Sequence, residues 1–150
     1  MSYELAVVTR AEDWHAYHSI RRVELFEARG RIGVYDPDHA DDRAPNRFPL
    51  LLKWNERGIA TTRLDLRGSG LAIVRLVAVV KTEQRKGHGR ALAARTEAFA
   101  RDRGVTRLLV NAAADAVGFY ERLGFVREGW DTVELVGWNA DSVQMAKTLA

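Results

Sequence analysis

Apolar and polar positions follow a strand-like or a helix-like period along most of the chain. The periods predict strands at residues 4–8, 48–54, 59–66, 71–80, 106–111, 125–136 and 142–149, and helices at residues 10–28, 90–104 and 112–123. Between the first helix and the second strand, residues 31–47 are rich in Gly, Asp and Pro and form a long loop. A loop of this length in a compact domain is more often functional than a simple connection.

The order of these elements predicts a mixed sheet. Three strands between residues 48 and 80 are joined by short turns, which indicates an antiparallel meander. The strand at 71–80 is apolar almost throughout, so we expect it to be buried on both faces. The helix at 90–104 leads from it to the strand at 106–111, and such a crossover makes the two strands parallel. The sequence therefore predicts an α+β domain with both antiparallel and parallel strands in its sheet.

Several residue types mark the ends of the predicted helices. Thr9 is followed three residues later by Glu12, which is the pattern of a capping box, so the first helix should begin at Arg10. Gly30 and Gly104 follow the first and the central helix, where glycine is a common C-terminal stop residue.

The composition is that of an ordinary globular protein. The chain has 150 residues, of which 47% are hydrophobic and 29% charged, and this predicts one domain over residues 1–150. The absence of cysteine excludes disulfides, a thiolate metal site and a cysteine nucleophile. The sequence has neither a long apolar run nor the pattern of a secretory signal, so we expect a cytoplasmic protein without a membrane partner.

The stretch between the central strand and its helix has the features of an anion-binding site. It runs Lys81-Thr-Glu-Gln-Arg-Lys-Gly-His-Gly-Arg90 and leads directly into the helix. The first N–H groups of a helix lack intrahelical partners and lie at the positive end of the helix dipole, which favours phosphate. Glycines let a ligand approach the backbone closely, and the basic side chains add positive charge. The sequence therefore predicts a phosphate-containing ligand at this turn.

Other phosphate-binding patterns do not fit this stretch. A P-loop needs four residues between its glycines and then Gly-Lys-Ser/Thr, and the turn lacks both. The dinucleotide fingerprint needs Gly or Ala at its third position, where this chain has Leu92. Nucleic acid is disfavoured because the basic residues behind the net charge of +3 are scattered rather than gathered in a stripe.

Two motifs resemble those of the GNAT superfamily of acetyl-CoA-dependent N-acetyltransferases. Gln84-Arg-Lys-Gly-His-Gly89 is similar to the family's pyrophosphate loop, Gln/Arg-x-x-Gly-x-Gly/Ala, and Gly118-Phe-Tyr-Glu-Arg-Leu-Gly-Phe125 resembles its fourth-helix segment. Together they cover about residues 70–130, whereas the N-terminal half is similar only in the order of its elements. The resemblance implies an α+β fold of three layers, with a mostly antiparallel central sheet of about six or seven strands, flanked by about four helices, and with splayed central parallel strands.

The resemblance also implies where acetyl-CoA binds. In the family, the pantetheine arm pairs with the backbone of the fourth strand, which corresponds here to Val77, Ala78 and Val79. The pyrophosphate would be held, mainly through N–H groups, by Gln84, Arg85, Lys86, Gly87, His88, Gly89 and Arg90. His88 is expected to be an exposed residue that contributes only its N–H. No metal is implied.

Tyr120 corresponds to the tyrosine that usually acts as general acid in the family. It would protonate the departing thiolate of coenzyme A; the alternative is a half-buried core aromatic. The family often has an asparagine seven residues earlier, where this chain has Ala113, and Asn111 or Asp115 is the expected substitute. Many relatives carry a glutamate on the fourth strand as base, but residues 71–80 contain only Arg75 as a charged residue.

The acceptor side is predicted from charge. An amine with a pKa near 10 must lose a proton before it attacks, so a base is required. Glu24, on the first helix, and Asp65, on the strand before the central one, are the candidates, acting through a water molecule. The acidic loop at residues 36–42 would attract a cationic amine, with Tyr35 and Asp36 in the acceptor site.

The resemblance thus implies an N-acetyltransferase that transfers an acetyl group from acetyl-CoA to a primary amine, on a small molecule or a protein, by direct transfer in a ternary complex. Two alternatives stay open: a non-catalytic acyl-CoA-binding module on the same fold, and a small basic nucleic-acid-binding domain. A homodimer is common in the family. A metal site is not predicted, because His15 and His18 lack further ligands and residues 36–42 lack the Gly and Glu of a calcium loop.

Overall fold

A computed structural model describes residues 2–149. Within these residues a seven-stranded sheet has the strand order β1-β2-β3-β4-β5-β7-β6. The strands are β1 (Tyr3–Val7), β2 (Arg47–Trp54), β3 (Arg57–Gly68), β4 (Leu71–Val79), β5 (Arg107–Ala112), β6 (Val126–Arg127) and β7 (Val143–Thr148). Neighbouring strands are antiparallel except for β4 and β5, which are parallel. The predicted mixed, mostly antiparallel sheet is confirmed.

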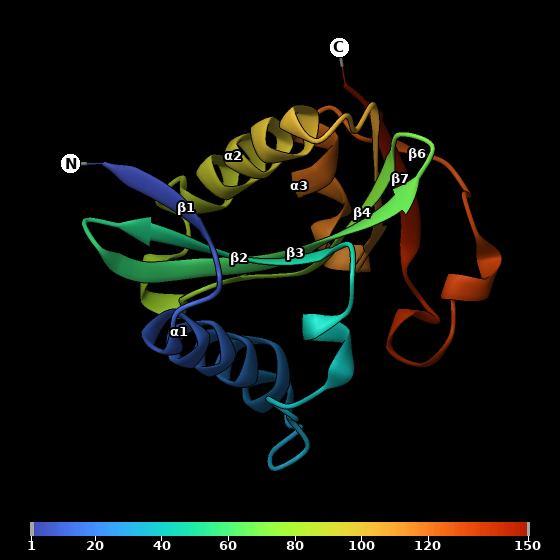
Figure 1. The fold of residues 1–150 in the computed structure, drawn as a ribbon. Coiled ribbons are helices and arrows are strands. Elements are labelled where there is room, and N and C mark those ends of the chain that lie inside the picture. The colour runs from blue at the N-terminus through green and yellow to red at the C-terminus, as the bar shows by residue number, and fades with distance from the viewer. Residues whose placement is uncertain (1, 150) are drawn as a thin grey trace.

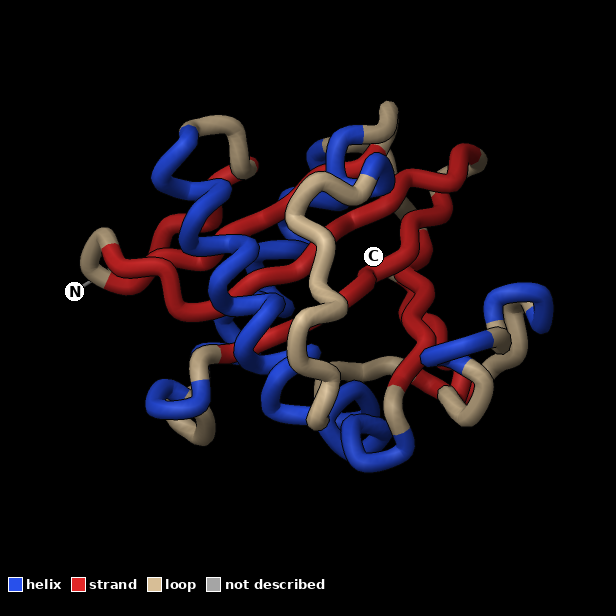
Figure 2. Tube along the Cα trace, turned by 90° about the horizontal axis from the view of Figure 1, so that it is seen from below, coloured by secondary structure: helices blue, strands red, loops and turns tan. Residues whose placement is uncertain are grey.

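Helices cover both faces of the sheet and produce three layers. α1 (Ala11–Arg21) lies on one face, and α2 (His88–Asp102) and α3 (Val117–Arg122) lie on the other (Figure 1). Seen from the side of α1, this helix crosses the strands of the sheet (Figure 2). Over the described residues there are three α-helices where about four were expected, and the other helical segments are short 3-10 or π turns.

The first helix is shorter than the one predicted for residues 10–28. α1 ends at Arg21, and the chain continues as a π-helix over Arg22–Phe26 and a 3-10 turn over Glu27–Arg29. The N-cap of α1 is Arg10, without a side-chain hydrogen bond, so the predicted capping box is wrong. Glu12 pairs with the side chain of Arg10 instead of reaching back to the backbone. π segments are frequent at functional sites.

The strand predicted for residues 125–136 is wrong beyond its first residues. β6 covers only Val126–Arg127, and the chain then passes through 3-10 turns at Thr132–Glu134 and Gly137–Asn139. The side chain of Gln144 explains this irregular path. Its amide oxygen accepts the N–H groups of Trp130 and Asp131 at 2.8 and 3.0 Å, and its Nε2 donates to the Asp131 carbonyl at 2.7 Å. These side-chain bonds take the place of a strand ladder.

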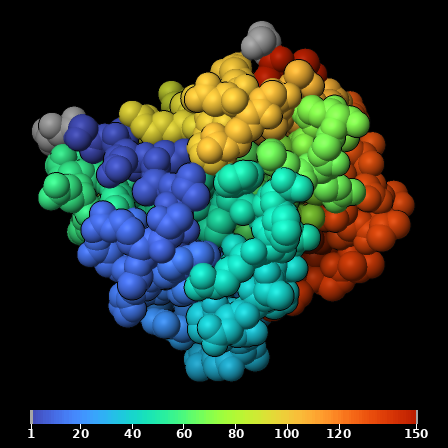
Figure 3. All heavy atoms as spheres, viewed as in Figure 1, coloured from blue at the N-terminus to red at the C-terminus, as the bar shows by residue number. Residues whose placement is uncertain are grey.

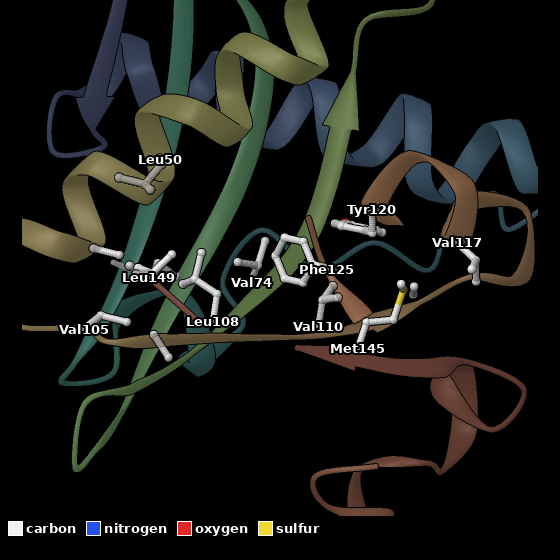
Figure 4. Close-up of a cluster of buried hydrophobic side chains, with 14 residues drawn as sticks. Leu50, Val74, Val105, Leu108, Val110, Val117, Tyr120, Phe125, Met145 and Leu149 are labelled. Atoms are coloured by element: carbon white, nitrogen blue, oxygen red, sulfur yellow. The ribbon is translucent and has the colours of Figure 1, made fainter. Parts of the chain in front are cut away.

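The largest cluster of buried apolar side chains lies between the sheet and the α2–α3 layer. Figure 4 shows Val74, Leu108 and Val110 of the two parallel strands close to Phe125 and Tyr120. Burial of such a side chain stabilises the fold by about 1.5–3 kcal/mol. The cluster therefore holds α3, and with it Tyr120, firmly against β4 and β5.

The two parallel strands separate halfway along their length. β4 pairs with β5 only from Leu71 to Val74, although both strands continue further. Beyond this point β4 bulges at Leu76, whose φ of 55° is unusual for a residue with a side chain. The hydroxyl of Thr62 donates to the Arg75 carbonyl at 2.8 Å and holds the bulge against β3. The β5 side of residues 75–79 is thus left without a neighbouring strand, which confirms the predicted splaying.

Candidate active site

A cleft of about 490 Å³ lies where β4 and β5 separate. It is bounded by the C-terminal end of α1 and the π segment, the loop at residues 31–42, the diverging strand ends and part of the loop after β6. In the space-filling view, the loop segment coloured cyan lies between α1 in blue and the C-terminal region in orange-red (Figure 3). Segments that are far apart in the sequence therefore surround one space.

A second, apolar cavity of about 40 Å³ lies between β4, α2 and α3. Its lining includes Gly89 and Phe119, and it shares Val74, Val77 and Tyr120 with the larger cleft. Tyr120 therefore stands between the two cavities, beside the gap between the strands.

The turn between β4 and α2 presents a row of free backbone donors. None of the six N–H groups from Arg85 to Arg90 donates a hydrogen bond to another described residue, and the first helical bond joins the Ala91 N–H to the Gly87 carbonyl at 3.1 Å. Gly87 is the N-cap of the 15-residue helix α2 and has a left-handed φ of 83°, with open space where a Cβ would stand. Free N–H groups at the positive end of a helix dipole bind anions, so this turn fits phosphate groups.

The side chains of the turn hold its shape and supply charge. Gln84 donates its Nε2 to the Val79 carbonyl at 3.0 Å, which ties the turn to the end of β4. Lys86 pairs with Glu83 at 3.5 Å. Arg85 and Arg90 are exposed and form no ion pair with another described residue, so their guanidinium groups are available to a ligand.

His88 is not the exposed residue that the sequence suggested. Its side chain is 5% exposed, with Nδ1 2.6 Å from the Tyr3 hydroxyl and Nε2 3.4 Å from a carboxylate oxygen of Glu83. The ring of Trp54 lies beside it, at 5.8 Å between ring centroids. Its side chain therefore anchors the turn to β1, while its N–H stays in the row of free donors. No local pattern signals this contact, because Tyr3 lies 85 residues away in the sequence.

Tyr120 is both a core residue and a cleft residue. Its ring packs against Phe119 and Phe125, each at 5.3 Å between centroids, and the residue is 7% exposed. Its hydroxyl donates to no other described residue, and the side chain lines the cleft. Burial raises the pKa of Tyr120 to about 12, so the phenol is protonated at neutral pH and can act as a proton donor. The core position and a role as general acid are compatible.

Buried ion pairs form the floor of the cleft. Arg63 binds both carboxylate oxygens of Asp65, with Nε–Oδ1 at 2.8 Å and Nη2–Oδ2 at 3.0 Å, and its Nη1 donates to Asp42 at 3.2 Å. Arg21 donates to the same oxygen of Asp42 at 2.8 Å. The alternation of Arg63 and Asp65 on one strand is a signal in the sequence, but the contact with Asp42 joins distant segments.

Arg75 extends this network across β4. It donates to Asp65 at 2.8 Å and, with Nη1 and Nη2, to Glu134 at 2.8 and 3.1 Å. These hydrogen bonds hold the pKa of Glu134 below its usual range. Asn111 donates to Glu134 at 3.2 Å and accepts from Gln144 at 3.0 Å. Neither end of the Asn111 amide is free, so the predicted cofactor contact through this side chain is not supported; Asp115, the other expected substitute, is exposed and lines the cleft.

The structure also argues against both predicted bases. Asp65 is 4% exposed, and its oxygens accept hydrogen bonds from Arg63 and Arg75. Glu24 accepts the N–H of Lys81 at 3.0 Å, which fastens the π segment to the β4–α2 turn. Neither carboxylate lines the cleft. Both are occupied by contacts that hold the protein together.

Tyr35 and Asp36 do line the cleft. The hydroxyl of Tyr35 lies 2.5 Å from Nδ1 of His18, a contact that the sequence did not suggest. Burial lowers the pKa of His18 and raises the pKa of Tyr35 to about 12. Asp36 is exposed and accepts the N–H of Asp38 at 2.9 Å.

Within residues 2–149, no group of three or more His, Asp or Glu side chains is arranged to hold a metal ion. None of the helices in this range combines the length and the apolar character that a membrane span requires.

Comparisons with known proteins agree with this geometry. A candidate N-acetyltransferase from Lactobacillus plantarum superposes with a TM-score of 0.82 at 22% identity, over 100% of both chains. The ribosomal-protein-S18-alanine N-acetyltransferase from Escherichia coli gives a TM-score of 0.74 at 20% identity, over 99% of this chain and 95% of that chain. PaiA N-acetyltransferase from Thermoplasma acidophilum, in complex with coenzyme A, gives 0.73 at 14% identity, over 99% of this chain and 100% of that chain.

At these identities the solved structures show a shared fold. Membership is shown by sequence, because residues 11–125 match the family model described as "Acetyltransferase (GNAT) family". The chain therefore belongs to the GNAT family of acetyltransferases.

Proposed function

We propose that this protein is an N-acetyltransferase that transfers the acetyl group of acetyl-CoA directly to a primary amine in a ternary complex. The observation that carries the proposal is the row of free N–H groups at the start of α2, next to the open edge of β4. Tyr120 stands beside the same gap. An anion site, an unpaired strand edge and a proton donor are the three parts that binding and cleaving an acyl-CoA thioester require.

The residues present fit coenzyme A. The N–H groups of residues 85–90, with the guanidinium groups of Arg85 and Arg90, would hold the pyrophosphate. The open edge of β4 would pair with the amides of the pantetheine arm, as an added strand does. Because the carbonyl of Val79 already accepts from Gln84, we assign this pairing mainly to Val77 and Ala78. The bound thioester would supply the activated acyl group.

Tyr120 is the proposed general acid. Its protonated hydroxyl would donate to the sulfur of the departing coenzyme A. A thiol has a pKa near 8.5, so its thiolate is already a fair leaving group and one hydrogen bond is sufficient help.

Tyr35 and His18 are the proposed route for the proton of the amine. The ammonium would give its proton to Tyr35 Oη while the Tyr35 hydroxyl proton passes to His18 Nδ1, 2.5 Å away. Because burial lowers the pKa of His18, its imidazole is neutral near pH 7 and able to accept. This pair replaces Glu24 and Asp65, whose carboxylates are engaged elsewhere.

The test is release of free coenzyme A from acetyl-CoA across a panel of small amines, amino acids and peptides. We expect release that depends on the amine and yields the N-acetylated product. Binding of coenzyme A without turnover on any amine would favour a non-catalytic acyl-CoA-binding module. Salt-sensitive binding to DNA without binding to coenzyme A would favour a nucleic-acid-binding domain.

A further inference from the structure

We infer that the cleft recognises a carboxylate of its substrate through the Nε and Nη2 edge of Arg21. The molecule bound there would then carry a carboxylate as well as the reacting amine. The inference rests on the proposed function, because it names the class of substrate for that site.

Arg21 is a buried arginine with donors to spare. It is 5% exposed and lines the cleft, and its Nη1 donates to Asp42 at 2.8 Å. Its Nε is enclosed by the protein and has no hydrogen-bond partner among the described residues. Its Nη2 likewise donates to no described residue. A buried donor without a partner is costly, so such a group calls for an explanation.

Arg63 and Arg75, the other two arginines at the cleft floor, show how the hydrogen bonding of Arg21 differs from that of an ordinary ion pair. Arg63 and Arg75 each donate with all three nitrogens, Nε, Nη1 and Nη2, to carboxylate oxygens. Arg63 binds both oxygens of Asp65 with its Nε and Nη2, the same edge that has no hydrogen-bond partner among the described residues in Arg21. We call the Nε and Nη2 donors of Arg21 its fork. A carboxylate is the partner that fits the fork, because two parallel hydrogen bonds match its two oxygens.

The guanidinium group of Arg21 is also held in place. Its central carbon lies 4.7 Å from the ring centroid of Tyr17 and 5.8 Å from that of Tyr35. With Nη1 fixed on Asp42, these rings limit how the group can turn. An edge that is oriented before the ligand arrives costs less entropy on binding.

The charges around the cleft fit a ligand with both signs. Arg21 shares one oxygen of Asp42 with Arg63, so that carboxylate is divided between two cations. Asp36 and Asp115 line the same cleft and form no ion pair with another described residue. A molecule that carries an ammonium and a carboxylate, such as an amino acid, would meet an opposite charge for each group.

The experiment compares matched acceptors in the turnover assay. Each amino acid is measured beside its amide and beside the amine that lacks the carboxyl group. We expect the best acceptor to carry the carboxylate, and its amide to lose about 10²-fold in kcat/KM, because the amide leaves the fork unpaired. Arg21→Gln should bring this ratio close to one with the KM for acetyl-CoA unchanged. Equal kcat/KM for acid and amide in the wild type overturns the inference.

Two further variants keep the test sharp. Arg29→Gln removes an exposed cleft arginine that makes no ion pair within residues 2–149, and it should leave the ratio of acid to amide unchanged. Arg21→Lys keeps the charge beside Asp42 but not the fork, so it should fold like the wild type and still lose most of the preference. A preference retained in Arg21→Lys, or lost equally in Arg29→Gln, contradicts a role for the Arg21 fork.

A second arm tests whether the carboxylate belongs to the acyl group instead of the amine. Succinyl-CoA and malonyl-CoA are therefore compared with acetyl-CoA on the same acceptor. Preference for an acidic acyl chain that disappears in Arg21→Gln would place the carboxylate on the donor and would overturn its assignment to the acceptor. If no amine is acylated at all, the proposed function fails. Calorimetric titration of the amino acids into the coenzyme A complex still tests the Arg21 subsite. Amino-acid binding that Arg21→Gln does not weaken overturns the subsite.

Discussion

Arg63 and Asp65, two residues apart on β3, form a two-point ion pair with Nε–Oδ1 at 2.8 Å and Nη2–Oδ2 at 3.0 Å. Residues at i and i+2 of a strand point to the same face, which brings the two side chains together. Arg75 on β4 donates to the same carboxylate at 2.8 Å. Asp65 is therefore an anion that holds two arginines at the cleft floor.

Asp65→Asn should accordingly act on stability. It leaves Arg63 and Arg75 without their shared counter-charge, and breaking a buried ion pair costs about 3–5 kcal/mol in the free energy of unfolding. Urea denaturation measures this loss, with Asp102→Asn, an exposed aspartate on α2, as control. The pH dependence of kcat in the folded variant should keep its wild-type shape. A changed pH profile at wild-type stability would restore Asp65 as a base.

Two glycines allow a matched test of whether the β4–α2 turn binds the pyrophosphate of coenzyme A. Gly87 and Gly104 have φ values of 83° and 79°, and a Cβ at either position would meet no atom within 4 Å. Alanine at either site should destabilise the fold by about 1–2 kcal/mol, because both force a left-handed residue. Only Gly87→Ala adds a methyl group beside the free N–H groups, so only it should weaken coenzyme A binding, by about 10-fold or more in Kd.

Calorimetric titration of coenzyme A into both variants gives the comparison. A further arm uses pantetheine, which lacks the pyrophosphate and should raise the melting temperature of the wild type much less than coenzyme A does. Equal weakening in the two glycine variants, or equal thermal shifts from the two ligands, would speak against pyrophosphate binding at the turn.

The predictable part of the fold is the part that local patterns encode. The apolar run at 71–80 and the glycine turn after it predict β4, the start of α2 and the parallel partner β5, all of which the structure contains. The strand predicted beyond residue 127 fails because Gln144 binds backbone groups of the loop with its side chain. Periodicity carries no information about such a long-range contact.

The same distinction applies to the site. The β4–α2 turn, with its free N–H groups, is one continuous segment, so its residue types could be recognised from sequence. The cleft is assembled from distant segments: Asp42 meets Arg21 and Arg63 across 21 residues in each direction, and His18 meets Tyr35 across 17. Position in the sequence alone could not show that the carboxylates of Glu24 and Asp65 already bind other groups of the protein.

Tyr120→Phe should lower kcat more than it raises the KM for acetyl-CoA. In the proposed role the lost hydroxyl would act on charge that develops in the transition state, whereas the ring that packs in the core is retained. We expect a loss of about 10²-fold or less, because the thiolate is a fair leaving group. An unchanged kcat would make Tyr120 a core aromatic only.

The pKa of Tyr120 gives this role a pH signature. Because burial raises it to about 12, the proton donor stays in its active form well above the ordinary phenol pKa of 10. Ionisation of Tyr120 should therefore not lower the kcat of the wild type between pH 8 and about pH 10.5. Any decline of kcat in this range should be equally present in Tyr120→Phe. A decline near pH 10 that Tyr120→Phe abolishes would mean that the hydroxyl ionises normally and is more open to water than its packing indicates.

The proposed route for the proton of the amine runs through Tyr35 to His18. His18→Gln removes the base at the end of the proposed route, and Tyr35→Phe removes the hydroxyl that links it to the cleft. Each should lower kcat at pH 7 by about 10²-fold, a usual contribution of general base catalysis. Burial lowers the pKa of His18 from 6.5, so the wild-type imidazole is neutral at pH 7. The kcat of the wild type should therefore fall only below pH 6.5, where the imidazole becomes protonated. Both variants should lose this decline of kcat at acidic pH and should recover part of their activity at pH 9–10, where free amine is abundant.

His15→Gln, on the exposed side of the same helix, is the control and should behave like the wild type. If His18→Gln and Tyr35→Phe both keep wild-type kcat at pH 7, the proton leaves directly to water and the pair serves only to hold the loop at residues 31–42 against α1.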